Sequence, residues 1–349
     1  MAAVMPRGYR SVTEYRFREE HAEAIVRTTS YHYQDFFRSV IWFPSRKHVD
    51  VRLSMAAPFQ RTSSRGLGSL DRLPLELLQY VFLCLDMRGL FNFRQTNLRS
   101  REMVDSLNQY RMVVSHGLNL FCALLRTRLA VGVSLFDFYC ALCTKACSFC
   151  GEFSGFIFLP TWNRCCFKCL QHAPETQVQT LAAVRKQFHL AKTELRQLRS
   201  FKTLPGTYGD FMNESTYKAR ITVTSVHQAA LVSGPQPQAQ SAVSGRKLKN
   251  LNFMSSCALP YYDRQTDRVE HGISCAGCQL ALEKGIIGSR GEKWEFEARD
   301  KIYARDPFLE HFRWCEQAQL LWSSSDEGNT RPPELPVFAR TGGCFNNRG

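Results

Sequence analysis

The stretch from Leu70 to Leu85 reads LDRLPLELLQYVFLCL, and it decides how this part of the chain folds. Pro74 suits the first turn of a helix, because the N–H that proline lacks would have no partner there. The apolar residues behind it share one broad helical face: Leu77, Leu78, Val81, Phe82 and Leu85. A second short helix around Leu90 and a third around Met103 complete a predicted unit of three helices.

Three short helices of about 40 residues cannot bury all of these side chains on themselves, because units of that size usually need a metal, a disulfide or a partner. The surplus apolar face therefore predicts a docking surface for a second protein. The candidate partner-binding residues are Leu73, Pro74, Leu77, Leu78, Val81, Phe82, Leu85, Leu90 and Phe93. The alternative interpretation is that residues 70–108 are only an ordinary helical start to the domain.

This segment resembles an F-box, the module that binds the small Skp adaptor of cullin-RING ubiquitin ligases. The residues that match, in the family's order and spacing, are Leu70, Leu73, Pro74, Glu76, Leu77, Leu78, Val81, Leu85, Leu90, Arg94 and Arg101. Over residues 55–340 the layout is also similar to filamentous-fungal F-box proteins that carry a cysteine-rich region directly downstream. The resemblance implies a substrate receptor of an SCF-type cullin-RING ligase, and it names no protein substrate.

The cysteines point to metal. The 349 residues include 14 cysteines, and seven of them lie between Cys140 and Cys169. The sequence shows neither a secretory signal nor an apolar stretch long enough for a membrane span, so we expect the cytoplasm or the nucleus. Cysteines in these reducing compartments are poor disulfide candidates and good metal ligands.

Two Cys-x-x-Cys pairs predict the first zinc site. Cys147 and Cys150 form one pair, Cys166 and Cys169 form the other, and 15 residues separate them. Zinc prefers four tetrahedral thiolate or imidazole ligands, and this spacing is typical of four-cysteine sites. Because protein fills all four positions, the zinc would be structural and would leave no place for a reacting water.

The residues around this site carry further expectations. Residues 153–159 suit a short hairpin, and Trp162 is available to cover the metal. Cys165 adjoins Cys166, so only one of the two is expected to coordinate, and Cys166 has the better spacing. A third pair, Cys140 and Cys143, is either half of another site completed by Cys165 or His172, or a pair of buried thiols.

A second zinc site is predicted nearer the C-terminus. Cys275 and Cys278 form another Cys-x-x-Cys pair, and His311 and Cys315 are four residues apart on one helix face. Together they would make a site of three cysteines and one histidine. His311 taken alone is more typical of a half-buried histidine with an ordinary hydrogen bond. The spare candidates for this site are Cys257 and His271.

We therefore expect a mainly α fold with small β hairpins, in which an F-box-like three-helix unit precedes zinc-stapled α+β modules. The expected parts are a poorly ordered or atypical N-terminal extension at 1–66, the F-box at 67–110, a helical and four-cysteine zinc region at 111–210, a flexible linker at 231–250, a second Cys/His module at 251–322 and a disordered tail at 323–349. Residues 177–199 are expected to form one helix. Residues 1–54 are either a native extension or a leader before a true start at Met55.

Charge suggests a competing function. The formal net charge is +14, from 45 Lys and Arg against 31 Asp and Glu. A zinc-dependent nucleic-acid-binding protein is therefore the alternative, with a basic helix at 185–202. That helix lacks interleaved aromatic residues, and the zinc motifs lack the finger spacing that presents a helix to the major groove. No nucleophile motif, phosphate-cradling loop or zinc-protease helix is present, so we expect an adaptor rather than an enzyme.

Overall fold

The structure is a computed structural model that describes residues 6–44, 46, 49–56, 66–210, 213–234 and 248–344. Its α-helices are α1 (Ala22–Thr29), α2 (Gln34–Arg38), α3 (Val49–Ala56), α4 (Leu75–Cys84), α5 (Met87–Arg94), α6 (Leu98–Ser106), α7 (Asn108–Thr127), α8 (Leu135–Leu142), α9 (Phe167–His172), α10 (Leu181–Gln187), α11 (Lys192–Gln197), α12 (Val226–Ser233), α13 (Ala276–Glu283), α14 (Lys293–Asp300), α15 (Arg305–Phe312), α16 (Glu316–Ser323) and α17 (Val337–Arg340). Among the described helices, none combines the length and the apolar character that crossing a membrane requires.

The strands are short and every sheet is antiparallel and small. They are β1 (Ser30–Tyr31), β2 (Phe156–Phe158), β3 (Asn163–Cys165), β4 (Val178–Thr180), β5 (Ser200–Lys202), β6 (Gly206–Tyr208), β7 (Ser215–Tyr217), β8 (Thr222–Ser225), β9 (Ser256–Ala258), β10 (Tyr261–Asp263), β11 (Arg268–Glu270) and β12 (Ser274–Cys275). The sheet orders are β1-β12, β10-β11, β3-β2-β9, β4-β8-β5 and β6-β7. A mainly helical fold with small β elements is what the sequence predicts.

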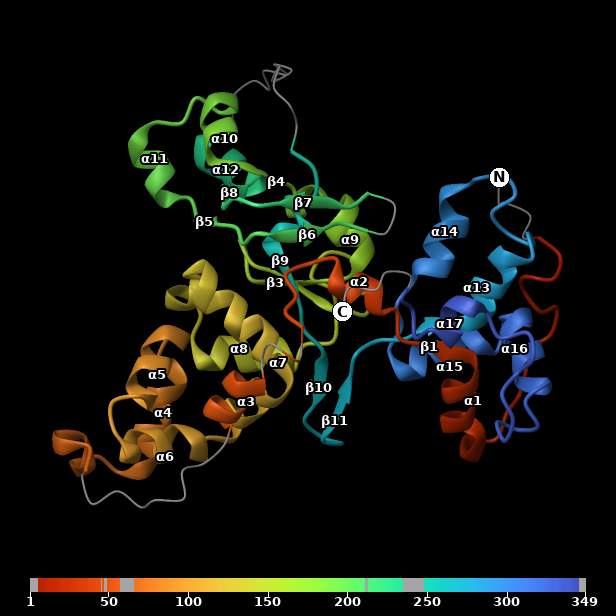
Figure 1. Cartoon of the computed structure of the whole chain (residues 1–349), viewed down its shortest axis with the longest axis horizontal. Helices are drawn as coiled ribbons and strands as arrows, with labels where there is room; N and C mark the ends of the chain where they lie inside the picture. Colours follow the sequence, from red (N-terminus) through yellow and green to blue (C-terminus); the bar gives the residue numbers. More distant parts are fainter. Residues whose placement is uncertain are drawn as a thin grey trace.

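Figure 1 shows three lobes around the central sheet β3-β2-β9. Helices α3 to α8 form a helical lobe, drawn in orange and yellow. The green β4-β8-β5 sheet and helices α10 to α12 form a second lobe. Helices α13 to α17, in blue, form a third lobe together with the red helix α1.

Local signals in the sequence define the ends of the short helices in the helical lobe. Asp86 caps α5 by accepting a hydrogen bond from the Gly89 N–H at 2.7 Å, and Asn97 caps α6 in the same way. The 20-residue helix α7 is the centre of this lobe, and α3, α5, α6 and α8 all pack against it. The core that the three short helices cannot build alone is therefore supplied by α7 and α8.

A buried ion pair joins α5 to α6. Arg94 is 2 % exposed, and its Nε donates to Oδ1 of Asp105 at 2.6 Å. A second nitrogen of the same guanidinium donates to Oδ2 of Asp105 at 3.1 Å, which makes the pair bidentate. The remaining nitrogen donates to the carbonyl of Ser54, so the pair also holds α3 in place.

The central sheet crosses an expected domain boundary. Residues 251–322 were expected to form the second Cys/His module, but strand β9 within them pairs with β2 in the first cysteine region. Asn119 on α7 reinforces this connection, because its amide donates to the carbonyl of Ile41 and to Sγ of Cys257. The segment around residue 257 therefore belongs to the central body, and the second module begins later in the chain.

The N-terminal segment differs from the expected extension, because residues 9–31 are built into the third lobe. Strand β1 pairs with β12, and the backbone of Tyr15 donates to the carbonyl of Arg313 at 2.9 Å. Ala22 and Ile25 of α1 are fully buried against α15 and α16. The apolar side chains of α1 pack on α15 and α16, almost 300 residues later in the chain. A local sequence pattern cannot reveal such a distant partner.

Two further expectations differ from the structure. Residues 177–199 form strand β4 and two helices, α10 and α11, because Thr180 caps α10 and the chain turns at His189, where φ is 52°. The segment after residue 323, expected as a disordered tail, carries α17, and Phe338 is 1 % exposed against Tyr31 and Tyr33. Most of the expected linker, residues 235–247, lies outside the described part.

Candidate metal centres and docking surface

The structure brings Cys147, Cys150, Cys166 and Cys169 together. Their four sulfur atoms all lie within 4.8 Å of one another, and Sγ of Cys150 is 3.6 Å from Sγ of Cys166. A tetrahedral zinc with Zn–S bonds of about 2.3 Å holds its sulfurs about 3.8 Å apart. The spacing therefore fits a four-coordinate ion, and the four residues can hold a metal.

Local backbone geometry aims these sulfurs at one point. Residues 146–153 form a tight turn in which the Gly151 N–H donates to the carbonyl of Cys147 at 3.0 Å, with φ of Gly151 at 78°. Glycine adopts that left-handed conformation without strain. On the other side, Cys166 caps α9, since its sulfur accepts the N–H of Cys169. Strands β2 and β3 form the hairpin that connects the two halves.

Hydrogen bonding in the first cluster favours a thiolate at Cys147. A hydrogen bond from the Cys166 thiol, together with backbone N–H groups, lowers the pKa of Cys147 to about 4. The same hydrogen bond raises the pKa of Cys166, and burial raises the pKa of Cys169 to about 12. Because the pKa values of Cys166 and Cys169 are raised, both keep their thiol protons, and a bound metal ion would take the place of these protons.

The second cluster contains Cys275, Cys278, His311 and Cys315, whose ligand atoms also lie within 4.8 Å of one another. Sγ of Cys275 is 3.7 Å from Sγ of Cys315, and Nε2 of His311 is 3.3 Å from Sγ of Cys278. All three cysteines are buried. This arrangement fits a metal site of three cysteines and one histidine.

Three helices supply the second cluster. Cys275 caps α13, Cys278 lies in its first turn, and Cys315 precedes α16. His311 lies on α15, where its ring stacks on Tyr303 with the centroids 4.9 Å apart. The stacking holds the imidazole so that Nε2 faces the sulfurs.

Other cysteines named in the sequence analysis lie elsewhere. Cys165 is fully buried in β3 and is not part of the first cluster, while Cys257 bonds with Asn119 and Ile41 in the central body. Within the described residues, no third ligand-type side chain joins Cys140 and Cys143. The side chain near this pair is Arg264, whose pKa is raised by a hydrogen bond with Cys143.

The expected roles of Trp162 and His271 also need correction. Trp162, expected to cover the metal, lies at the hairpin turn and packs against Phe138 of α8 with the ring centroids 5.8 Å apart. His271, a spare candidate ligand, packs beside His32 at 5.7 Å. Neither belongs to a metal cluster among the described residues.

The other candidate surface lies on α4. Leu77 and Val81 are 53 % and 42 % exposed, and Leu73 just before the helix is 39 % exposed. Comparison with known protein families matches residues 70–112 to the F-box domain. Residues 70–112 form an F-box domain. Comparisons of the chain with curated proteins and with solved structures found no match.

The exposed face of the F-box is narrower than the sequence predicts. Leu78, Phe82 and Leu90 were predicted to bind a partner, but they are 4 %, 1 % and 0 % exposed. Helix α4 is amphipathic, and its inner side, which carries Leu78 and Phe82, joins the core of the helical lobe where α8 packs against it. Leu85 and Phe93 are half-buried, so they are marginal members of the surface.

Sequence reasoning missed two further exposed residues of α4 and one buried cation. Leu75 and Tyr80 of α4 are 50 % and 68 % exposed. Arg164 is buried on β3 of the central sheet, where it donates to Ser154 Oγ at 2.8 Å and to the carbonyl of Leu259 at 2.7 Å. The position of Arg164 between two cysteine pairs does not indicate that it connects the segments around Ser154 and Leu259.

Proposed function

We propose that this chain is a substrate-receptor subunit of an SCF-type cullin-RING ubiquitin ligase. The F-box would dock on a Skp adaptor, and the metal-stabilised region would recruit a protein substrate. The observation that carries the proposal is the row of exposed apolar side chains on α4 within a matched F-box domain. Exposed contiguous apolar surface of this kind is typical of a protein–protein contact.

In this proposal the chain performs no chemistry of its own. Ubiquitin transfer would belong to the partner subunits, and the receptor would act by raising the effective concentration of the substrate near them. F-box proteins are generally adaptors rather than enzymes. We expect this activity in the cytoplasm or the nucleus, where such ligases work.

We also propose that the metal in both clusters is zinc and that its role is structural. The support is the donor set, which is four cysteines in the first cluster and three cysteines with one histidine in the second. Thiolate and imidazole ligands in tetrahedral groups of four are the combination that zinc favours in structural sites. Because the unfolded chain has no preformed site, zinc binding would stabilise the folded state.

A pull-down with a purified Skp adaptor tests the function. The test variant changes Leu73, Pro74 and Leu77 to alanine, which removes exposed apolar side chains at the start of α4 and leaves the buried Leu78 and Phe82 in place. The matched control changes Leu231, Leu320 and Val337, also exposed apolar residues, to alanine. We expect the control to recover as much adaptor as the unchanged protein, and the test variant to recover at least about tenfold less. Equal recovery by both variants would rule out the proposed docking.

A further inference from the structure

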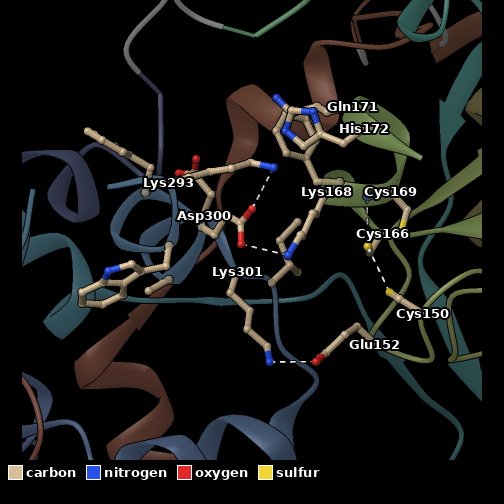
Figure 2. Close-up of a pocket in the computed structure, with 16 residues that line it drawn as sticks. Cys150, Glu152, Cys166, Lys168, Cys169, Gln171, His172, Lys293, Asp300 and Lys301 are labelled. Carbon is tan, nitrogen blue, oxygen red and sulfur yellow. Dashed lines mark hydrogen bonds and ion pairs between the residues drawn. The ribbon is translucent and has the colours of Figure 1, made fainter. Parts of the chain in front are cut away.

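A cleft of about 620 Å³ lies between α9 and α14. Helix α9 begins at the first cluster, and α14 packs on α13, which begins at the second cluster. Three of the four cysteines of the first cluster line this cleft, namely Cys150, Cys166 and Cys169. Figure 2 shows the three cysteines together on one side of the space. Among the described residues that line the cleft, none is a ligand of the second cluster.

The two clusters also differ in the exposure of their ligands. In the first cluster Cys150 is exposed and Cys169 is half-buried. In the second cluster Cys275, Cys278 and Cys315 are at most 2 % exposed. The N-terminal segment packs over this second cluster in one apolar core. A small reagent from solvent can therefore reach Cys150, and it is kept from the sulfurs of the second cluster.

The charges along the cleft are balanced. Its lining holds three lysines and three carboxylates, which are Lys168, Lys293, Lys301, Glu152, Glu297 and Asp300. Aromatic side chains on both walls, Phe167 and Phe296 among them, add apolar surface. Such a lining favours neither a cation nor an anion, and it admits a small neutral molecule. Hydrogen peroxide has these properties, and it oxidises accessible cysteine thiolates.

We propose that the first cluster is an oxidation site, at which hydrogen peroxide entering from the cleft converts Cys150 and Cys166 into a disulfide. Sγ of Cys150 is 3.6 Å from Sγ of Cys166, so the two sulfurs are in direct contact. Cysteines that hold a metal are thiolates, which is the form that peroxide oxidises. Exposure then decides which cluster reacts, because both clusters supply thiolates and only the first presents one to solvent. This inference rests on the proposed zinc sites, and it is independent of adaptor docking.

The reaction balances with one peroxide and two protons from solvent. The Cys150 thiolate attacks one oxygen of the peroxide, so that an S–O bond forms and the O–O bond breaks. The products are a sulfenic acid on Cys150 and a hydroxide, which a proton converts to water. The Cys166 thiolate then attacks the sulfenic sulfur, the S–O bond breaks, and a second hydroxide leaves and is protonated. The two sulfurs thus lose two electrons, and the peroxide is reduced to two waters.

Oxidation of two ligands removes the support of α9. After the disulfide forms, Cys147 and Cys169 supply only two thiolates, which are too few for a structural site of four ligands. Lys168 of α9 meets Glu297 of α14 at 2.8 Å across the cleft. Loss of the metal would therefore loosen one wall of the cleft, while the buried second cluster keeps its ligands.

Zinc release tests the order of oxidation. The full-length zinc-loaded chain is treated with hydrogen peroxide, and pyridylazoresorcinol reports the released zinc by its absorbance. One ion per chain should be released at least about tenfold faster than the other, because only the first cluster is exposed. Equal rates for both ions, or no release, would overturn the proposal. Elemental analysis before oxidation keeps the two proposals apart, since absence of zinc at the start would overturn the proposed metal role, whereas two ions that leave together would overturn this inference alone.

Mass spectrometry of the oxidised chain locates the modified sulfurs. Once the fast phase of release is complete, the chain is denatured, its free thiols are alkylated, and disulfide-linked peptides are identified after digestion. The expected result is a peptide pair joined through Cys150 and Cys166, with Cys275, Cys278 and Cys315 alkylated as free thiols. A disulfide among those last three would overturn the proposal. Dithiothreitol and added zinc should restore both ions, whereas a chain that stays oxidised would carry sulfinic or sulfonic acids and would overturn the proposed disulfide.

A variant that uncovers the second cluster tests the role of exposure. The hydroxyl of Tyr9 contacts Sγ of Cys278, so Tyr9→Ala should open the second cluster to peroxide. Release of the second ion should become about fivefold faster or more, while release of the first stays unchanged. The matched control is Tyr80→Ala, which removes an exposed tyrosine from α4 and should change neither rate. An unchanged rate for the second ion in Tyr9→Ala would show that burial does not set the order of oxidation and would overturn the proposal.

Discussion

The hydroxyl of Tyr9 lies 3.7 Å from Sγ of Cys278, although 269 residues separate them in the sequence. Tyr15 and Phe17 pack edge-on against Phe312 of α15, with ring centroids 5.5 Å and 5.8 Å away. The N-terminal segment thus covers the second cluster and shields its ligands from water. This cover and the cluster form one packing unit, so damage to either should weaken the other.

The first prediction tests this unit through Ile25, which is fully buried in α1. Ile25→Ala should lower the free energy of unfolding by about 2–4 kcal/mol, because a buried side chain of this size leaves a cavity. Val12→Ala is the control, since Val12 is 98 % exposed in the same segment. Urea unfolding followed by circular dichroism gives both values, and equal stability of the two variants would contradict the packing of α1.

The second prediction concerns metal content. The purified protein should contain two zinc ions per chain by elemental analysis, one for each cluster. Cys166→Ala should reduce the content to one, because the first cluster loses a ligand. Its neighbour in the sequence serves as the control, since Cys165→Ala removes a sulfur outside the cluster and should leave both ions bound. Two ions retained in Cys166→Ala would mean that Cys166 is not a ligand.

The third prediction separates the surface of the F-box from its core through two adjacent residues. Phe82 is 1 % exposed, so Phe82→Ala should cost about 3–5 kcal/mol of stability. Val81 is 42 % exposed, so Val81→Ala should change stability by less than about 1 kcal/mol.

Thermal unfolding and adaptor pull-down together check this pair. Val81→Ala should weaken adaptor capture at an unchanged melting temperature. The opposite pattern, in which Val81→Ala melts early and Phe82→Ala does not, would show that α4 presents its other face to the core.

The fourth prediction concerns pH and His32. Burial lowers the pKa of His32 below its ordinary value of 6.5, although its Nδ1 bonds with the carbonyl of Gly272 at 2.9 Å. The neutral ring is therefore favoured in the folded state. Its contribution to stability is fully present above pH 6.5 and falls as the pH decreases below that value. The ring of His271, 5.7 Å away, would add repulsion if both became charged.

A comparison with His32→Gln isolates this effect. Because acid also releases metal from both proteins, the measured quantity is the difference in unfolding free energy between them at each pH. As the pH falls from about 7.5 to 5.5, the unchanged protein should lose more stability than His32→Gln. A difference that stays constant over this range would show that His32 does not couple to folding.

Two parts of the protein were predictable because their signals are local. The Leu-Pro-x-Glu-Leu-Leu pattern beginning at Leu73 needs only the neighbouring residues to predict a helix and its family, and the match to the F-box confirms it. Cys-x-x-Cys spacing likewise depends on one turn of backbone. The sequence therefore pointed to the two groups of four ligands that the structure brings together.

Other features of the protein depend on which distant segments pack against each other. A helical pattern shows that α4 has an apolar side, but only its packing within the helical lobe, where α8 contacts it, decides that Phe82 is buried and Val81 is exposed. The pairing of β9 with β2 moved an expected domain boundary, because strand partners come from distant segments. The cleft between α9 and α14 is likewise invisible to sequence patterns, since its walls come from segments far apart in the chain.

The sequence by itself determined the helical character, the F-box and the ligand sets, because each follows from residue types at fixed short spacings. The tertiary structure alone decided that the N-terminal segment covers the second cluster, which apolar side chains stay exposed, and that lysines and aromatic rings from two regions meet in one cleft. The physical reason is that a side chain becomes buried only when a second surface packs against it. A side chain's exposure depends on the segment that packs against it, and that segment can lie anywhere in the chain.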